Sequence, residues 1–134
     1  METRVLVINE PFVPDFCRTQ RWAARTRGRV LRAPDWLAYA TAVLEQAGVP
    51  VALYDFPARG WDKPQLRQLV ARRRPEWVVL DSTTPSIDSD IECARMCKEA
   101  HPDCRVIVVG PHASALREQT LREADGAVDV VRIG

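Results

Sequence analysis

The chain has 134 residues, a formal net charge of +1 and 46% hydrophobic residues. This length fits one domain, residues 1–134, with one buried core, and a charge near zero gives no reason to expect nucleic acid or an anionic membrane as partner. No apolar run approaches the roughly 20 residues that span a bilayer, and the amino terminus lacks the apolar core of a secretory signal. We therefore expect a cytoplasmic protein without a membrane span.

Five short runs rich in β-branched residues alternate with segments of helical periodicity. The runs are almost continuously apolar, which is typical of parallel strands covered on both faces. They occupy residues 4–8, 49–54, 77–80, 105–109 and 127–133.

The segments between these runs carry the start and stop signals of helices. A first helix is expected from Pro34 to Gly48, with an inward stripe made of Leu37, Ala40, Val43, Leu44 and Ala47. Later helices are expected over 62–74, 84–100 and 114–126, capped by Asp62, Thr84 and Ser114, and the last of them turns Leu116, Leu121 and Ala124 inward. Strands and helices that alternate in this way predict a doubly wound, five-stranded parallel sheet of the flavodoxin-like order 2-1-3-4-5, in three α/β/α layers.

Ligands of such sheets bind outside the carboxyl ends of the strands, near the switch point between the first and third strands. Three loops end there, and their residues are the candidate binding site: Asn9, Glu10, Pro11 and Phe12; Ser82, Thr83, Thr84 and Pro85; Gly110, Pro111 and His112. The hydroxyl groups could hydrogen-bond a ligand, and Gly110 would let a bulky group approach the backbone. The alternative is that Thr84 only caps a helix and its neighbours are ordinary loop residues.

The same loops exclude two nucleotide-binding motifs. Residues 9–16, after the first strand, contain no glycine, whereas a dinucleotide-binding loop and a P-loop both require several. A phosphoacceptor receiver domain shares the fold and would use Asp81 at the end of the third strand. Glu10 supplies one of its acids, but the lysine after the last strand is missing. A receiver-like signalling domain phosphorylated at Asp81 is thus the alternative function.

Residues 35–55, 75–116 and 129–134 carry a resemblance to a known family. Their most specific parts are the hydroxyl residues before Pro85, the Gly-Pro-His turn at 110–112 and a final strand that ends in glycine. Over about residues 34–134 the chain resembles the amino-terminal cobalamin-binding domain of radical S-adenosylmethionine enzymes. Residues 11–30 are more narrowly similar to the leader loop of the radical enzymes associated with hopanoid lipid biosynthesis.

The resemblance implies that cobalamin lies across the carboxyl edge of the sheet, with its nucleotide tail between sheet and helix. By position, Ser82, Thr83 and Thr84 would line the tail pocket, and residues 110–112 would face its other side. The iron-sulfur cluster and S-adenosylmethionine would belong to a downstream radical domain beyond residue 134, so this chain alone would not be catalytic. The D-x-H-x-x-G motif, whose histidine ligates cobalt in cobalamin domains of the methionine synthase type, is missing. Only His101 and His112 exist, and we expect neither to bind cobalt.

The cysteines do not form the cluster motif of a radical enzyme. Cys93 and Cys97 match the first half of C-x-x-x-C-x-x-C, but position 100 is alanine and the next cysteine is Cys104. We expect all four thiols, including that of Cys17, to be reduced. The thiols of Cys93, Cys97 and Cys104 should be buried and structural.

A long connection, residues 9–33, joins the first strand to the first helix. It contains six arginines and no acid between positions 18 and 32: Arg18, Arg21, Arg25, Arg27, Arg29 and Arg32. Phe12, Phe16 and Trp22 lie among or just before them, a composition that also occurs in nucleic-acid binders. Because long loops in compact domains are often functional, we expect this one to cover the cobalamin edge or to contact a following domain. The alternative is a solvated loop.

Overall fold

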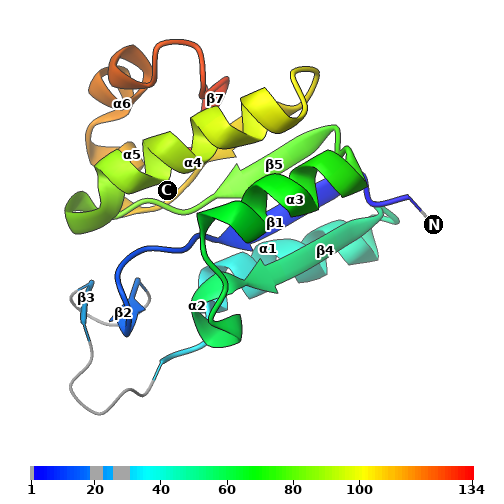
Figure 1. The fold of residues 1–134 in the computed structure, drawn as a ribbon, viewed down its shortest axis with the longest axis horizontal. Coiled ribbons are helices and arrows are strands. Elements are labelled where there is room, and N and C mark those ends of the chain that lie inside the picture. The colour runs from blue at the N-terminus through cyan, green and yellow to red at the C-terminus, as the bar shows by residue number, and fades with distance from the viewer. Residues whose placement is uncertain (1, 19–22, 26–30) are drawn as a thin grey trace.

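Five parallel strands form the central sheet in a computed structural model that describes residues 2–18, 23–25 and 31–134 (Figure 1). The strands are β1 (Val5–Asn9), β4 (Val51–Asp55), β5 (Trp77–Leu80), β6 (Arg105–Val108) and β7 (Val130–Val131). Their order is β4-β1-β5-β6-β7, which confirms the predicted flavodoxin-like order. The last strand is shorter than the predicted run.

Strand β1 occupies the second position in the sheet and is buried along its whole length. Side chains alternate between the two faces, so Leu6 and Ile8 point to one face and Val5 and Val7 to the other. The register aligns Val7 with Val79 of β5, and Val79 in turn with Ile107 of β6. One apolar row therefore crosses the sheet from strand to strand.

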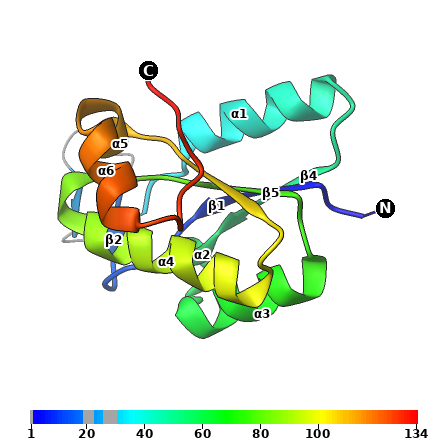
Figure 2. The ribbon, with the colours of Figure 1, turned by 90° about the horizontal axis from the view of Figure 1, so that it is seen from above.

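Helices α3 (Lys63–Arg73) and α4 (Ile87–Ala100) cover the first face, and α6 (Arg117–Ala124) packs beside α4 (Figures 1 and 2). Asp62 begins α3 as predicted, because its carboxylate accepts a hydrogen bond from the backbone N–H of Lys63 and takes part in a capping box with Gln65. The main core lies between these helices and the sheet, and Leu66, Leu80, Ile91 and Val106 are among its members.

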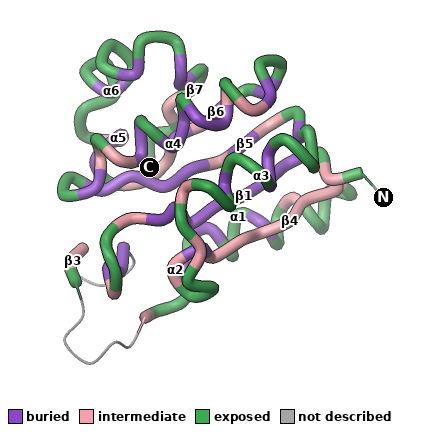
Figure 3. The backbone as a smooth tube through the Cα atoms, viewed as in Figure 1, coloured by how far each residue is buried: buried purple, intermediate pink, exposed green. Residues whose placement is uncertain are grey.

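Helix α1 (Asp35–Gln46) is the helix on the opposite face, where it packs on β4 and β1 (Figure 2). The predicted inward stripe is wrong for most of its members. Leu37 is buried and Leu44 half-buried, whereas Ala40, Val43 and Ala47 are exposed (Figure 3). One helix resting on a twisted sheet touches it along a narrow line, and no second helix of the described residues flanks α1 to bury its sides.

Strands β5 and β6 are consequently less covered on the α1 face than on the other. Val79, Ile107 and Val109 are half-buried there, while Val78, Val106 and Val108 on the opposite face are buried. The Arg105 guanidinium lies over the Trp77 ring, 5.3 Å from its centroid, at the amino end of the same strip. We call Val79, Ile107 and Val109 the open strip.

Several local elements differ from the predicted ones. Thr84 begins a 3-10 turn, η1 (Thr84–Ser86), and its side chain caps no helix. The predicted helix over 114–126 is split into α5 (Pro111–Ala115) and α6, so Ser114 lies inside a helix rather than at its cap. Leu116 and Leu121 are exposed, and Ala124 is buried as expected.

Three short elements were not predicted: α2 (Phe56–Arg59) and the antiparallel pair β2 (Phe16–Cys17) and β3 (Ala24–Arg25). The pair lies within the long connection, beyond the carboxyl end of β1 (Figure 1). Arg21, Trp22, Arg27 and Arg29 lie outside the described residues. Within the described part of the chain, no helix combines the length and the hydropathy that a membrane crossing requires.

All four cysteines are buried, as expected for the three that follow residue 90. Cys93 and Cys97 lie on α4, and Cys104 directly precedes β6. Burial raises the pKa of all three of these thiols, which keeps them protonated and poor as metal ligands or nucleophiles.

Candidate functional site at the carboxyl edge of the sheet

The three predicted loops meet at the carboxyl edge of the sheet. The Ser82 hydroxyl donates to the backbone carbonyl of Val109 (2.6 Å) and accepts from the N–H of Ala113 (3.1 Å), so one side chain joins β5 to the loop after β6. Thr84 Oγ1 and His112 Nδ1 are 3.1 Å apart, which links the same two loops nearer the surface. The sequence therefore located correctly which loops adjoin.

Gly110 is needed because the two loops approach each other closely. Its φ is +99°, and a Cβ atom there would stand 2.3 Å from Asp81 Oδ1 and 2.5 Å from the Ser82 carbonyl oxygen. Its absent side chain thus makes room for the end of β5 in the same protein, whereas the sequence suggested that it made room for a ligand.

The three consecutive hydroxyl residues have different environments. Ser82 and Thr83 are buried, and Thr84 is exposed. The Ser86 hydroxyl donates to Asp90 Oδ2 (2.7 Å), so the 2.6 Å contact between Thr83 Oγ1 and Ser86 Oγ has Thr83 as its donor. Of the three, Thr84 is the residue whose side chain reaches solvent at this edge.

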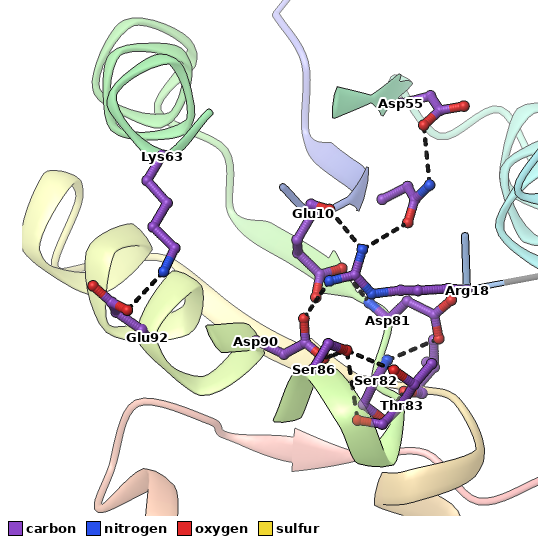
Figure 4. A network of polar contacts seen from close by, with 12 residues as sticks. Glu10, Arg18, Asp55, Lys63, Asp81, Ser82, Thr83, Ser86, Asp90 and Glu92 are labelled. Atoms are coloured by element: carbon purple, nitrogen blue, oxygen red, sulfur yellow. Dashed lines mark hydrogen bonds and ion pairs between the residues drawn. The ribbon is translucent and has the colours of Figure 1, made fainter. Parts of the chain in front are cut away.

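Arg18 reaches into this edge from the long connection, and its side chain is completely buried (Figure 4). Its Nη2 donates to Asp90 Oδ1 at 2.6 Å, and its Nη1 donates to the Glu10 carbonyl oxygen at 2.6 Å and to Asn9 Oδ1 at 3.3 Å. Although burial by itself lowers the pKa of Arg18, Glu10 and Asp90 raise it, so the guanidinium stays charged. The carboxyl end of β1 is thus bridged to α4 by an arginine that lies in neither element.

Glu10 is the second buried acid of this cluster. Its Oε1 accepts from the Asp81 N–H at 2.6 Å, while its buried Oε2 has no hydrogen-bond partner. Burial and the Asp90 carboxylate raise the pKa of Glu10 well above its ordinary value, against the lowering effect of Arg18. Protonation of Glu10 would make it neutral and would leave Arg18 and Asp90 as a balanced ion pair.

Asp81 lies next to this cluster and is 9% exposed. Burial raises its pKa to about 6, although a hydrogen bond from the Ser82 N–H (2.8 Å) and the charge of Arg18 both lower it. Asp81 therefore carries a carboxylate that changes charge near neutral pH.

The residues of this cluster differ from those that the sequence predicted for the site. Asn9, Glu10 and Pro11 were expected to face a ligand, but all three are buried, and Phe12 is half-buried. Arg18, Ser86 and Asp90 were not proposed for the site. The spacing of Ser86 and Asp90, one helical turn apart and just after the hydroxyl residues, is the signal that could have found these two, whereas Arg18 carries no such signal. No group of three or more metal-ligating side chains occurs in the ranges that the structure describes.

Comparison with known proteins identifies the family to which this chain belongs. Residues 33–134 match the B12 binding domain model. A 100-residue stretch is 27% identical to the anaerobic magnesium-protoporphyrin IX monomethyl ester cyclase of Rubrivivax gelatinosus and covers 74% of this chain but 18% of that protein. The match spans less than a fifth of the relative's length. The match to the B12 binding domain model favours cobalamin binding over the receiver-like alternative. The chain belongs to the B12-binding domain family.

Proposed function

We propose that this chain binds cobalamin across the carboxyl edge of its sheet and positions it for a radical S-adenosylmethionine domain. The family match carries the first part of the proposal. The convergence of the loops after β1, β5 and β6 at the switch point supports this location, since parallel α/β sheets bind ligands there. The radical domain, with its iron-sulfur cluster and S-adenosylmethionine, remains an inference from the sequence resemblance.

The open strip gives the nucleotide tail of cobalamin a place to lie. Val79, Ile107 and Val109 form an apolar surface beside α1, and a parallel sheet normally has such a face covered. The benzimidazole at the end of the tail is flat and apolar, so burying it against valine and isoleucine side chains would be favourable. Thr84, at the carboxyl end of this region, has an exposed side chain for the polar part of the tail.

The contacts of the two histidines support a cobalt that has no protein ligand below it. His112 Nδ1 contacts Thr84, and its Nε2 is buried without a partner. His101 follows the carboxyl end of α4, at the opposite edge of the sheet. We therefore propose that cobalamin binds with its benzimidazole off the cobalt and with no protein histidine in its place.

Titration of the purified chain with hydroxocobalamin, followed by absorbance, tests binding. We expect saturable binding to the wild type and weaker binding to Val79→Phe, because the larger ring fills the open strip without burying a polar group. Val43→Phe is the matched control, since Val43 is exposed on α1 and points away from the sheet.

The same titrations with cobinamide, which lacks the nucleotide tail, locate the effect. Val79→Phe should bind cobinamide as the wild type does, because the substitution obstructs only the tail. Equal losses for both corrinoids would place the tail elsewhere, and a wild-type chain that binds neither corrinoid would refute the proposal.

A role in hopanoid lipid biosynthesis is the narrowest part of the proposal. It rests on the similarity of residues 11–30 to the leader loop of that enzyme group, and part of this segment lies outside the described residues. Deleting the gene and analysing the hopanoids of the host would test it, with loss or change of one hopanoid as the expected result.

A further inference from the structure

The segment Pro11–Arg18 leaves β1 at the carboxyl edge and is held there by its last side chain. The Arg18 side chain is fully buried and donates hydrogen bonds to Asp90, the Glu10 carbonyl and Asn9. A second tie comes from Arg25, whose Nε donates to the Pro14 carbonyl at 3.0 Å. The segment is therefore attached to both β1 and α4.

Separating Arg18 from Asp90 would cost free energy, because the ion pair is buried. Removing one partner of a buried pair leaves an uncompensated charge, which is strongly unfavourable. Any ligand that had to pull Arg18 away from Asp90 would bind more weakly by that cost. Arg18 is thus better suited to hold a part of the site in place than to move when a ligand binds.

The outer side of the segment is apolar. Val13 is 42% exposed, and Phe12 is half-buried with its ring edge-on to Phe16 at 4.8 Å between centroids. Phe16 is itself buried, and the Arg18 guanidinium lies 5.6 Å from its ring centroid. Holding Arg18 therefore also holds the two aromatic rings and the exposed Val13.

We propose that Arg18 is a positioning residue for the corrin ring: through Asp90 and the Glu10 carbonyl it fixes Phe12 and Val13 as an apolar wall against which the macrocycle rests. This inference rests on the proposed cobalamin function and adds the part of the site that touches the ring rather than the tail. Arg18 itself stays beneath the wall and does not contact the cofactor.

Arg18→Met is the main test, because methionine keeps most of the side-chain length and removes the charge and the donors. We expect affinities for hydroxocobalamin and for cobinamide to fall together by roughly 10- to 100-fold, the range seen when an outer-shell partner that orients a metal ligand is removed. Arg18→Lys should recover part of this loss, since an ammonium can pair with Asp90 but cannot also reach both acceptors on β1. Arg67→Met is the control, because it breaks an exposed ion pair with Glu99 at 2.9 Å, far from the edge.

Asp90→Asn keeps the inference testable if Arg18→Met does not fold. The amide can still accept from Ser86 but no longer balances Arg18, so we expect a smaller loss for both corrinoids in a chain that still melts cooperatively. Unchanged or tighter binding of both corrinoids by a folded Arg18 or Asp90 variant, while the wild type binds them, would overturn this inference and leave the cobalamin function standing. A wild type that binds neither corrinoid removes both.

Discussion

Asp81 is the residue whose titration should be visible in the stability of the protein. Burial raises its pKa from 3.8 to about 6 in the folded chain, so the folded state holds the proton more tightly than the unfolded chain does. Its contribution to the free energy of unfolding is therefore complete below pH 4 and is lost as the pH rises through about 6, by about 3 kcal/mol.

Urea unfolding of wild type and Asp81→Asn between pH 4 and 7.5 measures this contribution. The asparagine can still accept from the Ser82 N–H, so we expect its stability to decline less over this range than that of the wild type. The neighbouring Glu10, Arg18 and Asp90 are present in both proteins and largely cancel in the difference. Identical pH profiles would show that Asp81 does not titrate in this window, and the exposed Asp88→Asn serves as the control.

Gly110 tests the close approach of the loops after β5 and β6. Gly110→Ala places a methyl group within 2.5 Å of two atoms of Asp81 and Ser82 at a φ of +99°, and we expect it to lower the free energy of unfolding by about 2–4 kcal/mol. Gly60→Ala is the matched control, because Gly60 also has a positive φ, +66°, but nothing lies within 4 Å of its added Cβ. Strain without a clash should cost about 1–2 kcal/mol there. Equal costs in denaturant unfolding would mean that the loops can separate.

At the scale of elements, two neighbouring threonines at the turn η1 should affect different properties: Thr83 the stability of the fold and Thr84 the affinity for cobalamin. Thr83 is 2% exposed and donates to Ser86, so Thr83→Val should lower the stability of the fold by about 1 kcal/mol and leave cobalamin affinity little changed. Thr84 is exposed and caps no helix, so Thr84→Val should do the reverse and weaken cobalamin binding by roughly 5- to 100-fold. Titration and thermal melts on both single variants decide this. If Thr84→Val binds normally, its side chain does no more than contact His112.

The strands and their order could be predicted because each strand is a short apolar run between helix signals, and right-handed crossovers leave few possible orders. The inward stripe of α1 could not, since periodicity shows which helix face is apolar but not whether anything covers it. Trp36, Tyr39 and Val43 are apolar and exposed. Gly-Pro-His and the hydroxyl residues identified two adjoining loops, but nothing local distinguished buried Ser82 and Thr83 from exposed Thr84.

Arg18 shows why the rest of the site was beyond sequence reasoning. It was one arginine among six in a stretch without acids, and its partners lie elsewhere in the chain. A buried arginine is recognised by the carboxylates around it, and those come together only when β1, β5 and α4 have packed. Sequence spacing records local neighbours such as Ser86 and Asp90, whereas contacts between distant segments leave no periodic signal.

For the molecule as a whole, these long separations affect the order in which the protein folds. Asp90 pairs with Arg18 across 72 positions, and Glu10 accepts from the Asp81 amide across 71. Closing loops of this length costs chain entropy before any contact is gained, whereas each strand can dock on its adjacent helix over a much shorter span. Strand β1 pairs with β5 over the same separation, Val5 with Trp77, so the carboxyl edge forms only when these two strands have paired. During synthesis, Arg18 therefore lacks its carboxylate partner until Asp90 has emerged from the ribosome.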